Sequence, residues 1–276
     1  MRIRRLVVPV IAVVMAVGFG SSSVAGQADA SAPPLPNSMA AIGDSMTQAA
    51  DVCCWYGDHP ANSWSTGGAG WDGITSHYER LRALDPDIAG QRYNDAVSGA
   101  RMSDGPGQAQ RAVAQQAGYV TILLGANDLC TSSPGTMTSV DAFRRQFQQT
   151  LQILSEGLPS RARIFVASIP DVYQLWGIYH TDWLARSVWD IANICQSLLS
   201  PDRTAAQRAL VRDRNIAFND VLRSECAVVV HCRYDRGATF SHQFTRSDVS
   251  KLDYFHPSLS GQANLARITW AASWWS

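Results

Sequence analysis

From Met39 onward, short apolar runs alternate with longer stretches in which apolar residues recur at helical spacing. The run YVTILL at residues 119–124 is rich in apolar and β-branched residues, which is typical of a buried central strand. The pattern predicts strands over residues 39–43, 92–97, 119–124 and 164–168, and a weaker strand over 227–230.

One apolar stripe predicts a long amphipathic helix in the middle of the chain. The helix begins just after Ser139, which fits a helix N-cap. The stripe consists of Phe143, Phe147, Leu151, Leu154 and Leu158. Strands that alternate with helices favour a parallel sheet flanked by helices. The other predicted helices cover about 71–84, 108–117, 181–199 and 204–226, and a last one, capped by Ser260, ends at Trp274 and Trp275.

The chain is long enough for one sizeable core, with 276 residues of which 46% are hydrophobic. No second linker, repeat or low-complexity block interrupts residues 39–276, so we expect them to form one domain. The preceding residues 31–38, SAPPLPNS, are rich in Pro and Ser and predict a disordered lead-in.

The N-terminus has the pattern of a secretory signal peptide, predicted over residues 1–30. Arginines precede an apolar run at 6–20, and the sequence ADA at 28–30 fits the small-residue cleavage rule. An uncleaved anchor is the alternative, but the run is short for a membrane span and lacks a second basic flank. We expect a secreted, extracellular protein with no stable membrane anchor after cleavage.

Export would place the six cysteines in an oxidising environment, where an even number favours disulfides. No C-x-x-C occurs and the histidines do not cluster around the cysteines, so no metal is expected there. Cys226 and Cys232 are close enough in sequence to staple one loop, and Cys195 lies in a predicted helix that could pack beside Cys130. If both pairings hold, Cys53 and Cys54 are left with each other. A disulfide between two cysteines adjacent in sequence, such as Cys53 and Cys54, is uncommon. Either this bond forms a rigid turn or one of the other two pairings is wrong.

Charge gives little indication of a polyanionic partner. The formal net charge at pH 7 is zero, with 23 basic and 23 acidic residues. Because no basic face is implied, nucleic acid and anionic membranes are not expected partners. We expect a monomer.

Gly43-Asp44-Ser45 ends the first predicted strand and places Ser45 at a strand-to-helix turn. Such a turn exposes a hydroxyl and directs nearby backbone N–H groups toward the same point. Serine is a poor nucleophile unless a base takes its proton. Taken alone, the tripeptide is more simply explained as a helix cap, and Asp44 is expected only to shape the turn.

His256 is the candidate base, because Asp253 lies three residues before it and could hold the imidazole through its other nitrogen. Such a carboxylate also stabilises the imidazolium that forms during attack. Alone, the pair would equally fit a loop histidine beside a turn-forming aspartate.

Acyl transfer also needs donors directed at the developing oxyanion. The backbone N–H groups of Ser45 and Gly99 and the side-chain amide of Asn127 are the candidates. A left-handed turn at Gly99 and an Asx turn at Asn127 explain each residue singly. Each segment nevertheless follows a predicted strand or precedes a helix, where the sites of open parallel sheets lie, and their joint placement favours catalysis.

These segments together resemble the sequence blocks of the SGNH (GDSL-type) hydrolase family. The resemblance covers residues 43–258, nearly all of the expected mature chain. One departure is Met46, which stands where leucine usually follows the serine. The segments that carry the resemblance are GDS at 43–45, Gly99, GAND at 125–128, and Asp253 with His256.

The resemblance implies a flavodoxin-like three-layer α/β/α domain with a parallel central sheet. It implies a catalytic triad of Ser45, His256 and Asp253, and an oxyanion hole formed by Ser45, Gly99 and Asn127. It also implies ester substrates and neither a metal nor a cofactor.

Residues 53–71 follow the nucleophile and are rich in Trp, Gly and Asn. A disulfide-pinned surface loop explains this composition. A functional interpretation is a substrate rim in which Trp55, Trp64 or Trp71 contacts the substrate. Aromatic residues suit lipid chains and sugar rings equally, so they do not identify the substrate.

The leading hypothesis is a secreted carboxylic-ester hydrolase of lipase or esterase type, which acts on small-molecule or lipid esters through an acyl-enzyme on Ser45. A second is a polysaccharide or glycoside O-acetylesterase, which would act on acylated sugars with the same residues. A third is a catalytically silent secreted binding protein. The joint presence of Ser45, Asn127, Asp253 and His256 argues against it.

Overall fold

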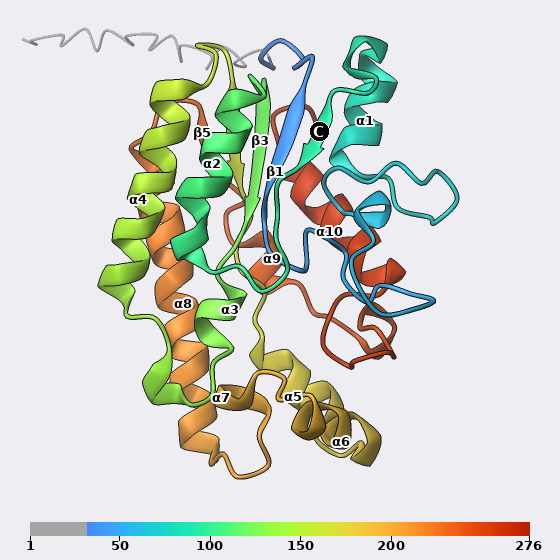
Figure 1. The fold of residues 1–276 in the computed structure, drawn as a ribbon, viewed down its shortest axis with the longest axis vertical. Helices are drawn as coiled ribbons and strands as arrows, with labels where there is room; N and C mark the ends of the chain where they lie inside the picture. Colours follow the sequence, from blue (N-terminus) through green and yellow to red (C-terminus); the bar gives the residue numbers. More distant parts are fainter. Residues whose placement is uncertain (1–31) are drawn as a thin grey trace, which may run out of the picture. The chain divides into compact units, whose positions relative to one another are not determined.

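Five parallel strands form the centre of the domain (Figure 1). The computed structural model describes residues 32–276, and the predicted signal peptide lies outside the described residues. The order β2-β1-β3-β4-β5 is that of a flavodoxin-like sheet. The strands are β1 (Met39–Gly43), β2 (Arg92–Asn94), β3 (Tyr119–Leu123), β4 (Arg163–Val166) and β5 (Cys232–Tyr234).

Side chains alternate across the sheet and supply two hydrophobic cores. Ile42 of β1 and Ile122 of β3 are neighbours in the parallel register and face one core. Met39 and Tyr119 are paired at the start of the same two strands and face the other core. Both strands are buried throughout, as expected for a sheet covered on its two faces.

Helices cover both faces, so the domain is the predicted three-layer α/β/α sandwich. In Figure 1, one layer lies to the left of the sheet and the other to its right. The left layer contains α2 (Gly105–Ala114), α4 (Val140–Gly157) and α8 (Ala205–Ala227), and the right layer contains α1 (His77–Leu84) and α10 (Leu259–Ala271).

Shorter helices lie in the connections. A single helix was expected over 181–199, but the chain there is broken, because Asn193 and Cys195 adopt left-handed backbone angles (φ 53° and 45°). The short α-helices are α3 (Ala126–Leu129), α5 (Tyr173–Tyr179), α6 (Trp183–Ile191), α7 (Gln196–Leu199) and α9 (Ala238–Ser241). Single 3₁₀ turns are η1 (Pro60–Asn62), η2 (Pro86–Ile88), η3 (Met102–Asp104), η4 (Pro134–Thr136) and η5 (Arg246–Asp248).

Capping side chains determine where several helices begin. Ser139 caps α4 as predicted, by accepting a hydrogen bond from the Ala142 backbone N–H. The first helix begins at His77 rather than near residue 71, because Ser76 and Glu79 form a reciprocal capping box. The last helix is capped by Ser258 and not by Ser260.

The strand predicted over residues 227–230 is wrong. Helix α8 continues to Ala227, and Val228 and Val230 are 78% and 77% exposed. The fifth strand begins at Cys232, where the main chain pairs with Ile164 of β4. Apolar β-branched residues suggested a strand here, but they lie in the turn that follows α8.

The end of the predicted disordered lead-in packs against the domain instead. The Trp275 indole N–H donates to the Pro33 carbonyl at 2.9 Å, and Leu35 packs on the core that contains Met39. Pro36 is buried as well. Apolar residues between the prolines, together with the C-terminal tryptophans, therefore order this stretch.

Two disulfides have the pairings expected from the sequence. Cys130 is bonded to Cys195 and Cys226 to Cys232. The suggested bond between the neighbouring cysteines 53 and 54 is absent, and both are free thiols. The chain forms a tight turn there, in which the Trp55 N–H donates to the Cys53 carbonyl at 2.7 Å.

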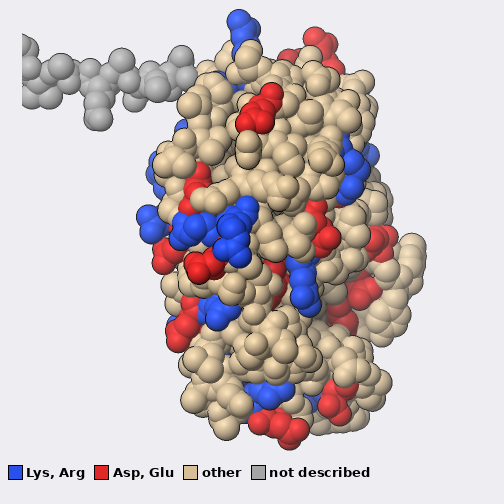
Figure 2. All heavy atoms as spheres, turned by 60° about the vertical axis from the view of Figure 1, so that its left-hand side comes forward, with Lys and Arg blue, Asp and Glu red and all other residues tan. Residues whose placement is uncertain are grey.

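Among residues 32–276, none of the helices combines the length and apolar character needed to cross a membrane. On the face shown in Figure 2, Lys and Arg side chains are interspersed with Asp and Glu side chains.

The two disulfides should contribute unequally to stability, because they close loops of different length. Their sequence separations are 65 and 6 residues. Loop-closure entropy predicts a loss of about 4 kcal/mol when Cys130 and Cys195 are both replaced by alanine, and about 2 kcal/mol for the Cys226 and Cys232 pair. Urea unfolding of the two double variants measures the difference, and a larger loss for the short loop would contradict it.

Candidate active site

Ser45 lies just beyond the carboxyl end of β1, in a turn that the end of the strand holds in place. Gln108 of α2 bonds both backbone groups of Gly43, accepting from its N–H at 2.8 Å and donating to its carbonyl at 2.9 Å. A Cβ at Gly43 would lie 2.8 Å from the Leu123 carbonyl oxygen, so β1 and β3 could not approach this closely with another residue there. The turn then directs Ser45 toward His256.

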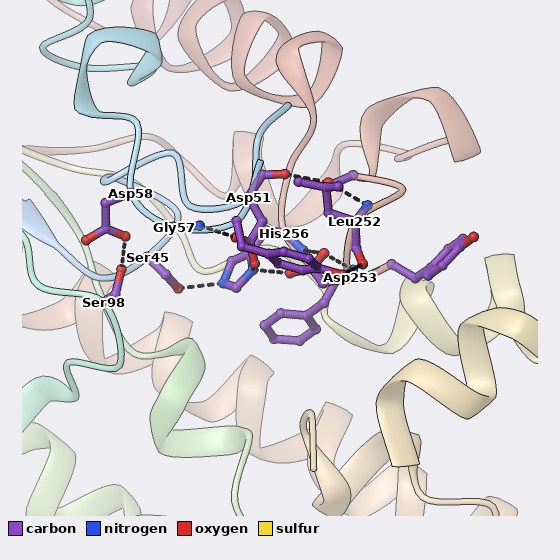
Figure 3. Close-up of polar contacts among 12 residues, drawn as sticks. Ser45, Asp51, Gly57, Asp58, Ser98, Leu252, Asp253 and His256 are labelled. Carbon is purple, nitrogen blue, oxygen red and sulfur yellow. Dashed lines mark hydrogen bonds and ion pairs between the residues drawn. The ribbon is translucent and has the colours of Figure 1, made fainter. Parts of the chain in front are cut away.

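His256 links the serine to a carboxylate. Its Nε2 lies 2.8 Å from Ser45 Oγ, and its Nδ1 is hydrogen-bonded to Asp253 Oδ2 (Figure 3). Asp253 is itself held, since its Oδ1 accepts from the backbone N–H groups of Phe255 at 2.9 Å and His256 at 3.1 Å. The three predicted triad residues are therefore brought into one hydrogen-bonded chain.

The electrostatics of this chain favour a charged His256. Burial alone would lower the pKa of His256, but the hydrogen bond to Asp253 and the charges of Asp253, Asp51 and Asp44 raise it above 6.5. Burial opposes ionisation of Asp253, yet its hydrogen bonds, first the one from His256, hold its pKa below the usual value. The pair is thus arranged to stabilise an imidazolium beside a carboxylate.

The three predicted oxyanion donors line one open cavity. Ser45, Gly99 and Asn127 all contribute to a depression of about 410 Å³. Gly99 has φ 83°, a left-handed angle that favours glycine. One N–H of the Asn127 amide donates to the Ala100 carbonyl at 2.9 Å, which leaves its second N–H for a ligand.

Asp128 joins the two oxyanion segments. Its Oδ2 accepts from the Met102 backbone N–H at 2.8 Å, and its Oδ1 accepts from the Thr138 hydroxyl at 2.7 Å. The loop that follows Gly99 is thereby tied to the turn that carries Asn127. Asp128 is visible in the GAND segment of the sequence, but the sequence pattern does not predict that its side chain connects these two segments.

Asp44 shapes the nucleophile turn, as expected. Its Oδ1 accepts from the Met46 backbone N–H at 3.0 Å, while its buried Oδ2 has no partner among the described residues. Burial raises the pKa of Asp44 to about 7.

A second, narrower cavity opens beside Ser45. It measures about 60 Å³ and is lined mainly by apolar side chains, among them Val172, Leu175, Ile178 and Phe244. Both cavities are lined by Ser45, Asn127 and His256, so the serine lies between a narrow apolar space and a wide one with a mixed polar and apolar lining. Sequence reasoning missed this apolar wall, which comes mainly from α5 and the loop before η5.

Trp64 is not part of a substrate rim. It is fully buried, its indole N–H donates to Thr47 Oγ1 at 3.3 Å, and its ring packs edge-on against His77. Trp55 and Trp71 are 66% and 71% exposed, but neither lines a cavity beside Ser45. The composition of this loop did not distinguish a core tryptophan from surface ones.

Asp51 is a residue at this site that sequence reasoning missed. Its Oδ2 lies 3.8 Å from His256 Nδ1, on the side of the ring that also faces Asp253. Within residues 32–276, these three side chains are the group whose ligand atoms lie close enough to hold a metal ion. Both nitrogens of His256 are already hydrogen-bonded, however, and this arrangement favours proton transfer.

Comparison with known proteins identifies the family of the chain. The sequence model for the GDSL-like lipase/acylhydrolase family matches residues 39–268. The chain belongs to this family. No curated protein matches the chain.

Solved structures of lipases and esterases share the fold. A putative GDSL-like lipase from Parabacteroides merdae superposes with a TM-score of 0.53 at 15% identity, covering 88% of this chain and 98% of that one. An acetyl xylan esterase gives 0.52 at 14% identity, covering 85% and 98%. An extracellular lipase from Streptomyces rimosus gives 0.50 at 14% identity, covering 86% and 99%. These likenesses confirm the predicted fold.

The raised pKa of His256 should be measurable directly. We expect an imidazole pKa above 6.5 in the wild type and a decrease of about one unit or more in Asp253→Asn, which removes the main groups that raise it. NMR titration of the His256 ring measures both values. Asp220→Asn, which removes an exposed carboxylate paired with Arg223, is the control. An unchanged pKa in Asp253→Asn would show that the pair is not coupled.

Proposed function

We propose that the protein is a serine hydrolase that cleaves carboxylic esters through an acyl-enzyme on Ser45. The observation that carries the proposal is the hydrogen-bonded chain from Ser45 Oγ through His256 to Asp253, at the edge of a cavity lined by Gly99 and Asn127. Membership of a family of lipases and acylhydrolases supports it.

The geometry supports the following sequence of proton transfers. Ser45 Oγ bonds to the ester carbonyl carbon while its proton passes to His256 Nε2, 2.8 Å away. The oxyanion accepts hydrogen bonds from the Ser45 and Gly99 backbone N–H groups and the free N–H of Asn127. His256 then protonates the leaving alcohol. Water attacks the acyl-enzyme by the same route, which releases the acid and restores Ser45.

The two cavities indicate how an ester would lie. An apolar acyl group fits the narrow cavity, because burying carbon there costs no polar contact. Its small volume of about 60 Å³ and its apolar lining favour a short acyl chain. The alcohol would then occupy the wide cavity, whose lining includes Asp58, Ser98 and Asn193.

The lining of the wide cavity also favours the O-acetylesterase alternative. A wide cavity with hydroxyl, amide and carboxyl groups can accept hydrogen bonds from, or donate them to, a sugar alcohol. We therefore keep two substrates for the same residues, a simple short-chain ester and an acetylated saccharide. The intact hydrogen-bonded chain disfavours a silent binding protein.

We also propose that the protein acts outside the cell. The two disulfides are compatible with an oxidising compartment, and the N-terminal pattern is that of a signal peptide.

The nucleophile is tested by substitution. Ser45→Ala should abolish hydrolysis of p-nitrophenyl acetate, and His256→Ala should reduce kcat by about 10³-fold or more, because the serine loses its base. Asp253→Asn should be less damaging than His256→Ala. Activity and thermal melting are measured on the same samples, so that loss of fold is recognised. Near wild-type turnover by a folded Ser45→Ala protein would refute the mechanism.

The acyl cavity predicts chain-length preference. The wild type should hydrolyse p-nitrophenyl acetate and butyrate faster than the palmitate, because the narrow cavity is too small for a long chain. Leu175→Ala enlarges that cavity and should shift the preference toward longer chains. Leu184→Ala, a partly exposed leucine of α6 outside both cavities, is the matched control.

Acetylated xylan in the same assay separates the two substrate classes. Acetate release from xylan well above that from simple acetates would favour the saccharide. A preference for palmitate in the wild type would contradict the assignment of the narrow cavity.

A further inference from the structure

Asp51 is fixed at both its main chain and its side chain. Its N–H donates to the Gly57 carbonyl at 2.9 Å, and its Oδ1 accepts from the Gly57 N–H at 2.6 Å. These two bonds close the loop 51–57 on itself. The Asp51 backbone itself has φ 53°, a left-handed angle that this closure maintains.

The same loop is fastened to the segment that carries the catalytic base. The Ser250 hydroxyl donates to the Asp51 carbonyl, and the Tyr56 hydroxyl donates to the Leu252 carbonyl at 3.0 Å. Figure 3 shows Asp51 and Leu252 beside Asp253 and His256. Asp51 is therefore held near the imidazole by both ends of its loop.

The position of its second oxygen is informative. Asp51 Oδ2 lies 3.8 Å from His256 Nδ1, which is too long for a hydrogen bond but close for two charges. The side chains of His256 and Asp51 are only 16% and 17% exposed, so water screens their interaction weakly. Asp253 already makes the hydrogen bond to this nitrogen.

Two carboxyl groups thus face one ring nitrogen with different roles available to them. Asp253 orients the ring, whereas Asp51 acts on it through charge alone. We propose that Asp51 is a second carboxylate of the catalytic base, a positioning residue that stabilises the imidazolium of His256 when Ser45 attacks. The proposal rests on the proposed hydrolase function.

The titratable groups around this carboxyl are few. Asp253 and His256 face it from the 250–256 loop, and Asp44 acts on His256 from the end of β1. Burial, and then the neighbouring Asp253 carboxylate, raise the pKa of Asp51, against the Gly57 hydrogen bond that lowers it.

A test must separate charge from loop closure. Asp51→Asn keeps an oxygen to accept the Gly57 N–H and removes the charge, whereas Asp51→Ala removes both. Tyr56→Phe is the matched control, because it frees the loop from Leu252 and leaves every charge in place. All three variants and the wild type are titrated by NMR at His256, and their kcat and KM for p-nitrophenyl acetate are measured against pH.

We expect Asp51→Asn to lower the His256 pKa and the acid limb of kcat by about one pH unit, since an opposite charge within 4–6 Å has an effect of that order. A neutral base is active, so the variant should retain more activity at low pH while its kcat at the plateau decreases by about tenfold. KM should change little. Tyr56→Phe should leave the His256 pKa unchanged.

Asp253 gives a second readout. If Asp51 and Asp253 both stabilise the His256 imidazolium, Asp253→Asn alone should reduce kcat by about 10²-fold. The double Asp51→Asn/Asp253→Asn variant should reduce kcat by about 10⁴-fold, as in a triad without its carboxylate. A loss of kcat in the double variant that equals the product of the losses in the two single variants would contradict a shared role.

An unchanged His256 pKa in Asp51→Asn would overturn the proposal, as would changes confined to the melting temperature. The two proposals fail in different ways. A folded wild type that hydrolyses no ester would refute the hydrolase function, while the NMR titration still decides whether Asp51 acts on His256.

Discussion

The parallel pairing of β1 with β2 on one side and β3 on the other determines where chemistry can occur. Parallel strands bring their carboxyl ends to one edge, and the order of the sheet reverses at β1. Ser45 follows β1, Gly99 follows β2 and Asn127 follows β3. Three segments far apart in sequence therefore meet beside one cavity, and Gln108 and Asp128 hold their relative positions.

His256 reaches this edge in a different way, since no strand precedes it directly. The loop that carries it is fixed by an antiparallel bridge between Val249 and Pro257, and Gln262 of α10 donates to the Met46 carbonyl at 2.8 Å. His256 is thus attached to the turn that carries Ser45 through the last helix. The alignment of His256 with Ser45 depends on packing of the C-terminal layer as well as on the sheet.

Sequence patterns predicted what is determined locally. The strand at 39–43 and the helix after Ser139 have bounds close to those observed, because periodicity and capping act over a few residues. The strand predicted at 227–230 is wrong because helix α8 continues to the start of this β-branched run. The single helix predicted at 181–199 is wrong because residues with left-handed backbone angles interrupt it. At the site, Asp253 was predictable because it lies three residues from His256, whereas Asp51 reaches the base only through contacts nearly 200 residues apart, 196 for Tyr56 to Leu252.

Carboxyl groups, and not basic side chains, determine the charge at the site. Among the described residues 32–276, no Lys or Arg lines either cavity beside Ser45, whereas three carboxyls act on His256. Burial raises the pKa of Asp44 to about 7 and the pKa of Asp51 above its usual value, and positive charge on His256 opposes both changes. In the proposed reaction, the N–H groups of Ser45, Gly99 and Asn127 would stabilise the oxyanion. The carboxyl groups around His256 favour positive charge on its ring, which the proposed reaction requires when Ser45 gives up its proton.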